Sequence, residues 1–500
     1  MAWAGSVSTT DNRSASADKG SRRRALGNEL GEADFLESRS ATGSGTVEDI
    51  VRWDVTSNQI SDTELGPNPL LPPSPTPSTP HYRLSLSDWQ RCEVLRPMAE
   101  AGVATSCINN SFIAAMTDQK TVIILGAGWA GLPLAHKLLK YTSSKTAIKV
   151  ILVSPNSHFF WNVAATRGLI PGMIPDESMF IPIATGFEHY AVGLFEFILG
   201  RATDIQSSSN SVTILTNTGG SRTLQYHQLV IATGSRLPGG LPLKPIGTHE
   251  ETLAAWHELQ ANVSRARDIV VAGAGPTGVE VAGELAAKFG KLKKITLIMR
   301  GDVPLESSSD VLSSVRTTLD KDLQKLGVEL IRKTCVKAVE AGDDGKTQVL
   351  ILDNGSRIVT ELYLPCHGIR LNNGFISDSF LDPHGNANID DNMRVLGTEN
   401  IWAIGDVSNA GPKQLTVTDN QIVYLAGALD AALTGKDSIA SYQPVKKTMI
   451  FLSLGRKYAT GQIGSWKLWG VLVSYVKGRN LFVDTADGYV SGKHLRHSSM

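Results

Sequence analysis

From Lys120 onward the chain shows a repeated order of apolar strand, glycine turn, helix and strand. This order predicts an α/β fold in which helices join parallel strands. The pattern starts twice, at Thr121 and again at Asp268, so we predict two α/β units. The connector between the units is predicted to be rich in strands, with apolar runs at 196–198, 211–215 and 229–233.

Two parts of the chain lie outside this repeat. After the second unit the pattern predicts apolar strands at 362–365 and 401–404, and then a last mixed segment at 442–489. Residues 1–115 are rich in Ser, Thr, Gly and Pro and show no sustained periodicity, so they cannot bury enough apolar surface to fold. We consider two interpretations of this tail. It is a disordered segment, or Met116 is the biological start and the upstream part is a gene-model artefact.

The first repeat has the sequence TVIILGAGWAGLPLA, in which an apolar strand leads directly into Gly126, Gly128 and Gly131. The first glycine of such a turn allows its tightness, the second lets the backbone approach a pyrophosphate, and the third allows helix and strand to pack closely. The helix N-terminus adds partial positive charge. We therefore predict a dinucleotide site here, made by Gly126, Ala127, Gly128, Trp129, Ala130 and Gly131.

The second repeat, DIVVAGAGPTGVEVAGELA, has the same design. It predicts a second dinucleotide site made by Gly273, Gly275, Pro276, Thr277 and Gly278. Glu280 and Glu284 follow four residues apart on the next helix, and we expect Glu284 to lie on its solvated face.

The ends of the two following strands bear on nucleotide choice. The strand at 149–153 is followed by Ser154 where an acidic residue would bind the adenosine ribose, and a serine still forms a neutral hydrogen bond there. The strand at 294–298 is followed by Met299 and Arg300, with no acid. An arginine at this point accepts a 2′-phosphate, which predicts that NADPH is used at least as well as NADH. The alternative is that Arg300 is an ordinary surface cation.

Two fingerprints about 150 residues apart suggest one site for FAD and one for NAD(P)H. LVIATGSRLP closes the first unit with Ala232, Thr233 and Gly234, and NIWAIGDVSN places Asp406 after the second unit. With these motifs the chain resembles the two-dinucleotide flavoproteins, in which the late aspartate binds the ribitol of FAD. It is most similar to the apoptosis-inducing-factor-like branch, close to ferroptosis suppressor proteins and more distantly to type II NADH dehydrogenases. The stretches HFFWNVAATRGL, LYLPCHGIRLNNGF, FLSLGRKYATGQIG and VKGRNLFV carry this resemblance.

The resemblance covers about residues 121–483 and implies which residues hold the cofactors. It implies FAD contacts at 126–130, Arg167, Ala202 and Asp406, and nucleotide contacts at 273–278 with Gly368 and Ile369. It also implies that Glu280 directs a carboxylate toward the nicotinamide. For Arg167 a salt bridge that fixes its loop is the alternative. The chain departs from the family at Ser154, at His227, where Asp is common, and in having no Gly at position 2 for myristoylation.

These assignments give two Rossmann-like domains and a small C-terminal α+β domain. The FAD-binding domain is predicted at 116–240 and 361–435, the NAD(P)-binding domain at 241–360 and the C-terminal domain at 436–500. We expect no catalytic triad and no metal site, because the flavin carries the chemistry.

Composition excludes several classes of function. The 48 basic residues balance the 48 acidic ones, so the net charge gives no field that would attract nucleic acid or an anionic membrane. The four cysteines are widely spaced, which argues against a secreted disulfide framework and against a redox-active dithiol. Cys366 is expected to be structural. We expect a cytoplasmic protein, with a membrane-peripheral or mitochondrial location left open, and no apolar run is long enough to span a bilayer.

Without a protein dithiol, the electrons must pass to a small-molecule acceptor, and the resemblance implies a quinone. A tailoring oxidoreductase for one small metabolite and a redox-sensing flavoprotein are the alternatives. The C-terminal segment, with Trp466, Trp469, Tyr475 and Phe482 among Lys467, Lys477 and Arg479, is either an interfacial face that reaches membrane quinone or a packed cover over the flavin. The oligomeric state is left open.

Overall fold

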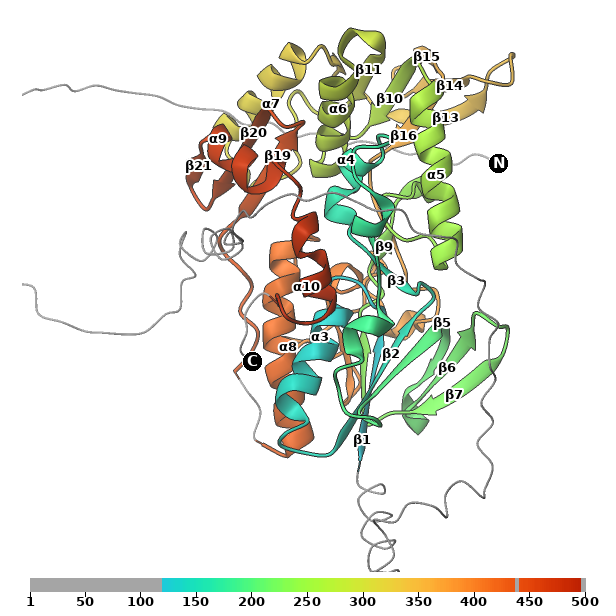
Figure 1. The fold of residues 1–500 in the computed structure, drawn as a ribbon, viewed down its shortest axis with the longest axis vertical. Helices are drawn as coiled ribbons and strands as arrows, with labels where there is room; N and C mark the ends of the chain where they lie inside the picture. Colours follow the sequence, from blue (N-terminus) through green and yellow to red (C-terminus); the bar gives the residue numbers. More distant parts are fainter. Residues whose placement is uncertain (1–118, 437–439, 496–500) are drawn as a thin grey trace, which may run out of the picture. The chain divides into compact units, whose positions relative to one another are not determined.

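The structure is a computed structural model that describes residues 119–436 and 440–495. The predicted tail at 1–115 and the proposed start at Met116 lie outside the described residues. Within them, two parallel sheets with helices form two α/β units, and an antiparallel sheet follows near the C-terminus (Figure 1). The α/β fold with two Rossmann-like units is thereby confirmed.

The first sheet has seven strands in the order β18-β8-β1-β2-β5-β6-β7. The first five run parallel, and β6 and β7 extend β5 as an antiparallel ribbon. The strands are β1 (Lys120–Leu125), β2 (Ile148–Ser154), β5 (Phe195–Gln206), β6 (Ser211–Thr216), β7 (Ser221–Gln225), β8 (Gln228–Ile231) and β18 (Ile401–Ala403).

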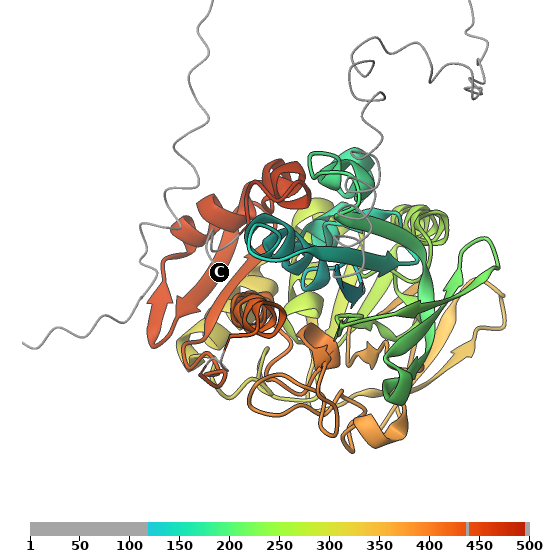
Figure 2. The same ribbon diagram turned by 90° about the horizontal axis from the view of Figure 1, so that it is seen from below.

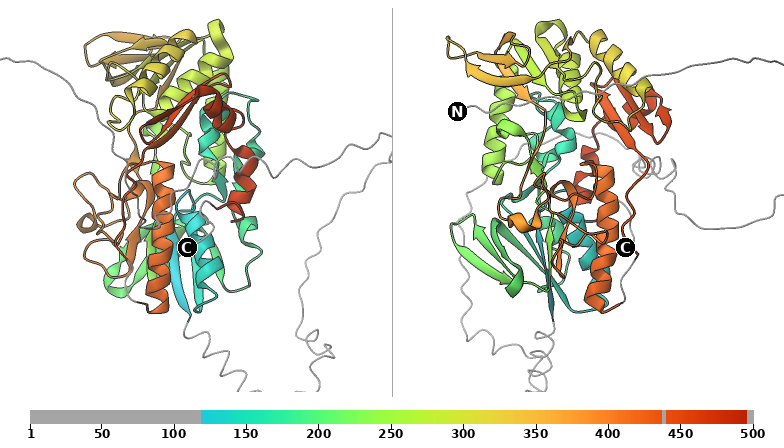
Figure 3. Two further views of the ribbon diagram at one scale, coloured as in Figure 1. Left: turned by 90° about the vertical axis from the view of Figure 1, so that its left-hand side faces the viewer. Right: turned by 180° about the vertical axis from the view of Figure 1, so that it is seen from behind.

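Both faces of the parallel part are buried, which explains the unbroken apolar run of β1. Val122 and Ile124 pack into the larger core cluster with helices α3 (Gly131–Lys137) and α8 (Leu415–Thr434). Ile123 and Leu125 pack into a second cluster on the other face. Figure 3 shows α3 and α8 side by side along this sheet.

The second sheet is fully parallel, in the order β12-β11-β10-β16. A three-stranded antiparallel sheet packs on it, with Leu350 and Leu352 against Val270 and Ala272. The elements are α5 (His249–Arg265), β10 (Asp268–Ala272), α6 (Pro276–Phe289), β11 (Lys294–Ile298), α7 (Ser313–Lys325), β12 (Glu329–Ile331), β13 (Val336–Ala341), β14 (Gln348–Leu352), β15 (Arg357–Thr360) and β16 (Leu362–Pro365).

The position of β16 differs from the predicted division of the chain. Residues 361–435 are predicted to belong with the first unit, but β16 pairs with β10 in the second sheet. The late strand that does return to the first sheet is β18, beside β8. Both are short apolar runs, and nothing in their composition tells the two sheets apart.

The C-terminal part begins with an antiparallel sheet of β19 (Met449–Leu454), β20 (Tyr458–Ile463) and β21 (Trp466–Leu468). In Figure 2 these orange-red strands lie on the side away from the green strands β6 and β7. β19 packs on α6, where a Cβ on Gly283 would lie 2.9 Å from the Cα of Leu454. After this sheet come α9 (Gly470–Val473), the π-helical turn η12 (Ser474–Gly478) and α10 (Ala486–Val490). A separate C-terminal domain stays a prediction.

Short elements complete the connections between the two units. They are β3 (His158–Phe160), α4 (Ala165–Gly168), β4 (Phe180–Pro182), the turn η6 (Ala184–Phe187), β9 (Ser235–Arg236) and β17 (Arg370–Leu371). Among the helices at 119–436 and 440–495, none has the length and apolar character needed to cross a membrane.

Candidate functional site: two glycine loops and the elements around them

The first glycine loop connects β1 to α3 at the carboxyl edge of the first sheet. Gly126 has a φ of +108°, and a Cβ there would lie 2.4 Å from the carbonyl oxygen of Ala232. A Cβ on Gly131 would lie 1.9 Å from the carbonyl oxygen of Gly126. Neither position tolerates a side chain. A Cβ on Gly128 would meet no atom within 4 Å, so the protein itself does not require glycine there and the space above it can take a ligand.

An aromatic cluster covers one side of this loop. The ring of Trp129 lies 5.0 Å from Phe159, 4.7 Å from Trp161 and 4.9 Å from Tyr489 between centroids. The indole N–H of Trp129 donates to Asn162 at 2.6 Å, and the Tyr489 hydroxyl donates to the Trp129 carbonyl oxygen at 3.2 Å. Tyr489 belongs to α10, so this helix contacts the first loop. The motif HFFWN was noted in the sequence, but the contact with Tyr489 was not predicted.

Ser154 and Ala202 lie along the same edge of the first sheet. Ser154 is buried at the end of β2, and its Oγ accepts a hydrogen bond from the Asn156 N–H at 3.1 Å. This hydrogen bond leaves the Ser154 hydroxyl able to donate to a further group. Ala202 lies further out in the ribbon of β5 and β6, next to a bulge, where it packs on the second core cluster.

Ala232, Thr233 and Gly234 follow β8 and face the first loop. The hydroxyl of Thr233 donates to the Asn372 carbonyl oxygen at 2.7 Å, and the Asn372 amide donates to the Thr233 carbonyl oxygen at 2.8 Å. Asn372 follows β17, which pairs with β9. At His227, where the family commonly has Asp, the imidazole Nδ1 accepts a hydrogen bond from the Thr121 N–H at 2.9 Å. The histidine therefore fixes the start of β1.

Asp406 lies in a short turn beside the first loop. The preceding Gly405 has a φ of +75°, and a Cβ on it would be 3.3 Å from the Cβ of Ala130. The Asp406 Oδ2 accepts from the Ser235 hydroxyl and from Lys244 Nζ, both at 2.6 Å. No described residue bonds Oδ1. Burial acts to raise the pKa of Asp406, but Lys244 and Ser235 outweigh it and hold this pKa below its usual value. Ser235 and Lys244 were not predicted.

The second glycine loop connects β10 to α6 and repeats the geometry of the first. Gly273 has a φ of +104°, and a Cβ there would lie 2.8 Å from the carbonyl oxygen of Cys366. A Cβ on Gly278 would lie 1.8 Å from the Gly273 carbonyl oxygen, and one on Gly275 would meet nothing within 4 Å. Pro276 and Thr277 form the first turn of α6.

The rim of the second loop is open to solvent. Arg300 is exposed just after β11 and forms no ion pair with a described carboxylate. Burial lowers the pKa of the His367 imidazole, and the nearby charge of Arg300 lowers this pKa further. Gly368 follows with a φ of +68°, and both it and Ile369 are exposed. The predicted residues of the second site therefore lie at one edge of the second sheet.

Glu284 is the clearest difference from the sequence prediction. The prediction that Glu284 lies on the solvated face is wrong, because its side chain is only 2% exposed. It forms a bidentate ion pair with Arg167 of α4. Arg167 Nε and Nη2 donate to the two carboxylate oxygens at 2.9 and 2.8 Å, and Nη1 donates to the Gly478 carbonyl oxygen at 2.8 Å. Burial raises the pKa of Glu284, against the opposing effect of Arg167. The ion pair is the alternative left open for Arg167, and its contact with FAD stays a prediction.

Glu280 lies one turn earlier on the same face of α6 and is also buried. Its Oε1 accepts from Lys477 Nζ at 2.7 Å and from the Ser453 N–H at 2.9 Å, and no described residue bonds Oε2. Lys477 lies on η12, so the C-terminal part of the chain holds Glu280 directly, and it contacts Arg167, the partner of Glu284, through the Gly478 carbonyl oxygen. The stretch VKGRNLFV was noted in the sequence, but this pairing was not predicted.

Cys366 directly follows β16 and is not a reactive thiol. It is buried against Gly278, and burial raises its pKa to about 12. The thiol is therefore neutral at ordinary pH, which agrees with the expected structural role. Of the described cysteines, Cys335 and Cys366, neither is in a disulfide.

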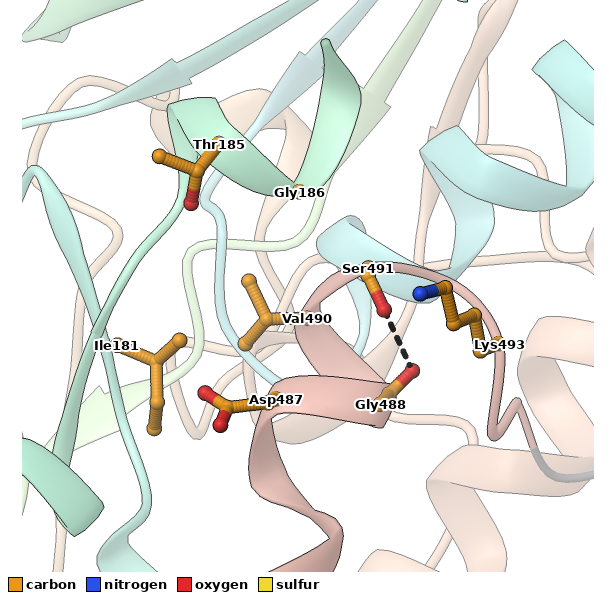
Figure 4. Close-up of a pocket in the computed structure, with 8 residues that line it drawn as sticks. All are labelled: Ile181, Thr185, Gly186, Asp487, Gly488, Val490, Ser491 and Lys493. Atoms are coloured by element: carbon orange, nitrogen blue, oxygen red, sulfur yellow. Dashed lines mark hydrogen bonds between the residues drawn. The ribbon is translucent and has the colours of Figure 1, made fainter. Parts of the chain in front are cut away.

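A separate cavity of about 310 Å³ opens between α10 and the turn η6 (Figure 4). Asp487, Ser491 and Lys493 line it on one side, and Ile181 and Thr185 on the other. None of its lining residues belongs to either glycine loop, so we do not assign it to the dinucleotide sites.

Comparison with known proteins shows which family and fold the chain resembles. A family model described as pyridine nucleotide-disulphide oxidoreductase matches residues 120–421. Oxidoreductase ptaL of Pestalotiopsis fici is 40% identical over 381 residues, covering 75% of this chain and 100% of that protein. Human ferroptosis suppressor protein 1 is 26% identical over 371 residues, covering 73% and 94%. The fold is similar to that of sulfide:quinone oxidoreductase from Aquifex aeolicus, with a TM-score of 0.60 at 18% identity over 76% of this chain and 93% of that one.

Proposed function

Since the chain belongs to the pyridine nucleotide-disulphide oxidoreductase family, we propose that it transfers electrons from NAD(P)H, through FAD, to a quinone. It is an FAD-dependent NAD(P)H oxidoreductase, as its family is. When bound, the flavin supplies hydride acceptance and onward electron transfer. The residues of the chain bind and orient the two nucleotides. The observation that carries the proposal is the pair of glycine loops with the same steric pattern.

The second glycine of each loop supports the proposal that both loops bind a dinucleotide. In each loop the first and third glycines are required by the protein itself, but the second faces empty space. A glycine there is explained by a ligand that approaches the backbone closely, as a pyrophosphate does. Each loop also leads into the N-terminus of a helix, where partial positive charge favours phosphate.

We assign FAD to the first loop. Its proposed ligands include the loop backbone at 126–131, Ser154 and the free Oδ1 of Asp406. The lowered pKa of Asp406 keeps this carboxylate ionised, so that Oδ1 can accept a hydrogen bond from a ribitol hydroxyl. Ala202, Arg167 and the turn Ala232, Thr233 and Gly234 complete the proposed site. The FAD-binding domain would comprise 116–240 and 361–435, apart from β16.

We assign NAD(P)H to the second loop, at 273–278, with Gly368 at its rim. The free Oε2 of Glu280 is the proposed acceptor for the carboxamide of the nicotinamide, and Lys477 and Ser453 hold that carboxylate in place. Arg300 is the proposed partner of a 2′-phosphate, because it is exposed and has no carboxylate partner among the described residues. The domains proposed around this site are 241–360 for the nucleotide and 436–500 for the C-terminal cover.

The acceptor is proposed to be external. Cys366 is buried and neutral, and neither it nor Cys335 forms a disulfide, so the described part of the chain offers no dithiol to reduce. A quinone accepts two electrons and two protons, the same numbers that a fully reduced flavin would release on returning to its oxidised form. The acceptor named for the sulfide:quinone oxidoreductase supports this class, although the likeness to that protein extends to the fold alone.

Anaerobic titration of the flavin-loaded protein with NADH and with NADPH, followed by a soluble ubiquinone analogue, tests the function. We expect the visible flavin absorbance to bleach with either nucleotide and to return when the quinone is added. Bleaching that a quinone does not reverse would overturn the quinone assignment and favour a metabolite-specific enzyme or a redox sensor. A protein that binds no FAD would overturn the proposal altogether.

A further inference from the structure

The charge of the C-terminal segment departs from that of the chain. The whole sequence has a net charge of zero, but residues 440–483 contain no aspartate or glutamate. Their seven cations are Lys446, Lys447, Arg456, Lys457, Lys467, Lys477 and Arg479. Of these, only Lys477 forms an ion pair with a described carboxylate. The balanced total therefore conceals a locally basic segment, which an argument from net charge alone does not take into account.

Large apolar side chains are exposed in the same segment. Trp466 is 78% exposed, Trp469 82% and Val471 84%. Tyr475 and Leu472 are also exposed, at 55% and 38%. These residues lie on β21, α9 and η12, with Trp469 at the N-cap of α9, and all fall within ten residues of sequence. Indole rings beside cations are typical of surfaces that enter the polar-apolar boundary of a bilayer.

A cavity of about 430 Å³ lies next to these residues, between the turn that joins β19 to β20 and the helical pair α9 and η12. It is lined by Arg456, Lys457, Val471, Ser474, Tyr475 and Arg479. The Ser474 hydroxyl donates to the Arg456 carbonyl oxygen at 2.6 Å and so fixes the turn against η12. Three unpaired cations and a phenol around one hollow form an arrangement suited to a phosphate group.

We propose that this cavity binds the headgroup of an anionic phospholipid while Trp466, Trp469 and Val471 enter the bilayer interface. The membrane explains both the cations and the apolar side chains, whereas a polynucleotide would leave Val471 and Leu472 without a partner. A second copy of the chain is a poorer occupant, because a twofold interface would bring the unpaired cations of the two copies together.

The site is connected to the chemistry through η12. Tyr475 of this turn lines the cavity, and Lys477 of the same turn bonds Glu280 in the proposed nicotinamide site. A bilayer bound here would present its dissolved quinone beside the proposed redox centre. This link to quinone reduction rests on the proposed function. Binding to vesicles is measured without turnover and is therefore tested independently.

The test is co-sedimentation of the full-length, flavin-loaded chain with vesicles of phosphatidylcholine alone or with about a third phosphatidylserine. We expect much stronger binding to the anionic vesicles. The triple variant Arg456→Gln, Lys457→Gln, Arg479→Gln should bind them roughly a hundredfold more weakly, at about fivefold for each cation. The matched control Lys291→Gln, Lys337→Gln, Lys346→Gln removes three exposed cations elsewhere and should bind as the wild type does.

A second variant, Trp469→Ser, should weaken binding to neutral and anionic vesicles alike, because it removes apolar rather than charged contact. Flavin content verifies that each variant is folded. The proposal is overturned if wild type ignores anionic vesicles, if the control triple loses as much binding, or if only an oligonucleotide binds. Dimerisation that Trp469→Ser abolishes would also overturn it. Reduction of a soluble quinone without vesicle binding would refute this site alone, whereas vesicle binding without quinone reduction would refute the proposed function alone.

Discussion

The two glycine loops share one backbone design but differ in what surrounds them. Around the first, Trp129 is packed between Phe159, Trp161 and Tyr489, and the turn with Asp406 approaches Ala130. At the rim of the second, Arg300 and Gly368 are exposed. One side of the first loop contacts chain from distant parts of the sequence, although Gly128 itself is exposed, whereas the rim of the second loop carries exposed side chains.

This difference bears on what each loop would hold. A loop that contacts several distant segments suits a cofactor that stays bound, and an exposed rim suits a nucleotide that enters and leaves in each cycle. The glycine motif alone specifies a dinucleotide, and the surroundings decide between a resident group and a substrate. The ion pairs of α6, Arg167–Glu284 and Lys477–Glu280, lie between the two regions and connect them.

We expect the largest effect from breaking the ion pair between Arg167 and Glu284. Arg167→Met leaves the Glu284 carboxylate buried and unpaired, which should lower the free energy of unfolding by about 3–5 kcal/mol. Chemical denaturation of the flavin-loaded protein measures this. The double variant Arg167→Met, Glu284→Leu removes both charges and should recover much of the loss. A single variant as stable as the wild type would show that the pair does not hold the two regions together.

The next prediction separates the loops by substitution. Gly126→Ala and Gly273→Ala each introduce a Cβ against a carbonyl oxygen at positive φ, a strain of about 3 kcal/mol. Gly126→Ala should lose FAD during purification. Gly273→Ala should keep it but require about a hundredfold more NAD(P)H to reduce it. Gly128→Ala is the control, since its Cβ meets no protein atom and should weaken FAD binding without lowering the stability of the FAD-free protein. Loss of FAD from Gly273→Ala but not Gly126→Ala would reverse the assignment.

Acid should destabilise the protein through a buried histidine of α3, the helix that follows the first loop. His136 of α3 bonds Tyr190 and the Val490 carbonyl oxygen, and burial lowers its pKa from 6.5 to about 4. The unfolded chain therefore binds this proton more readily, so stability is full above about pH 6.5 and falls as the pH drops toward 4. The loss at about pH 5 should be about 2 kcal/mol. Denaturation of wild type and His136→Gln across this range measures it, and an unchanged slope in the variant would contradict the assignment.

The smallest effect concerns nucleotide choice at the open rim. Arg300→Ala should raise the KM for NADPH about tenfold, or about 1.4 kcal/mol, and leave that for NADH unchanged. Steady-state kinetics with a soluble quinone measures both constants, and Lys337→Gln serves as a control on the same unit. Equal changes for the two nucleotides would show that Arg300 is an ordinary surface cation.

The local sequence predicts the two glycine loops but does not predict which residues pack around them. The steric demands on Gly126 and Gly273 arise within one strand-turn-helix unit, so the motif predicts them. Lys477 and Glu280 are 197 residues apart, and Tyr489 and Trp129 are 360 apart, so these contacts depend on tertiary packing. Glu284 appeared solvated in sequence because helical spacing alone does not reveal that α4 and the C-terminal segment cover this face of α6.

The contrast between a resident and an exchanging nucleotide is tested most directly on the wild type. The protein is incubated with FAD and NADPH, passed through a desalting column and denatured, and the released nucleotides are quantified by chromatography. We predict that FAD remains in equal amount to the chain while the nicotinamide nucleotide is removed. Retention of both nucleotides, or loss of FAD on the column, would contradict this account of the two loops.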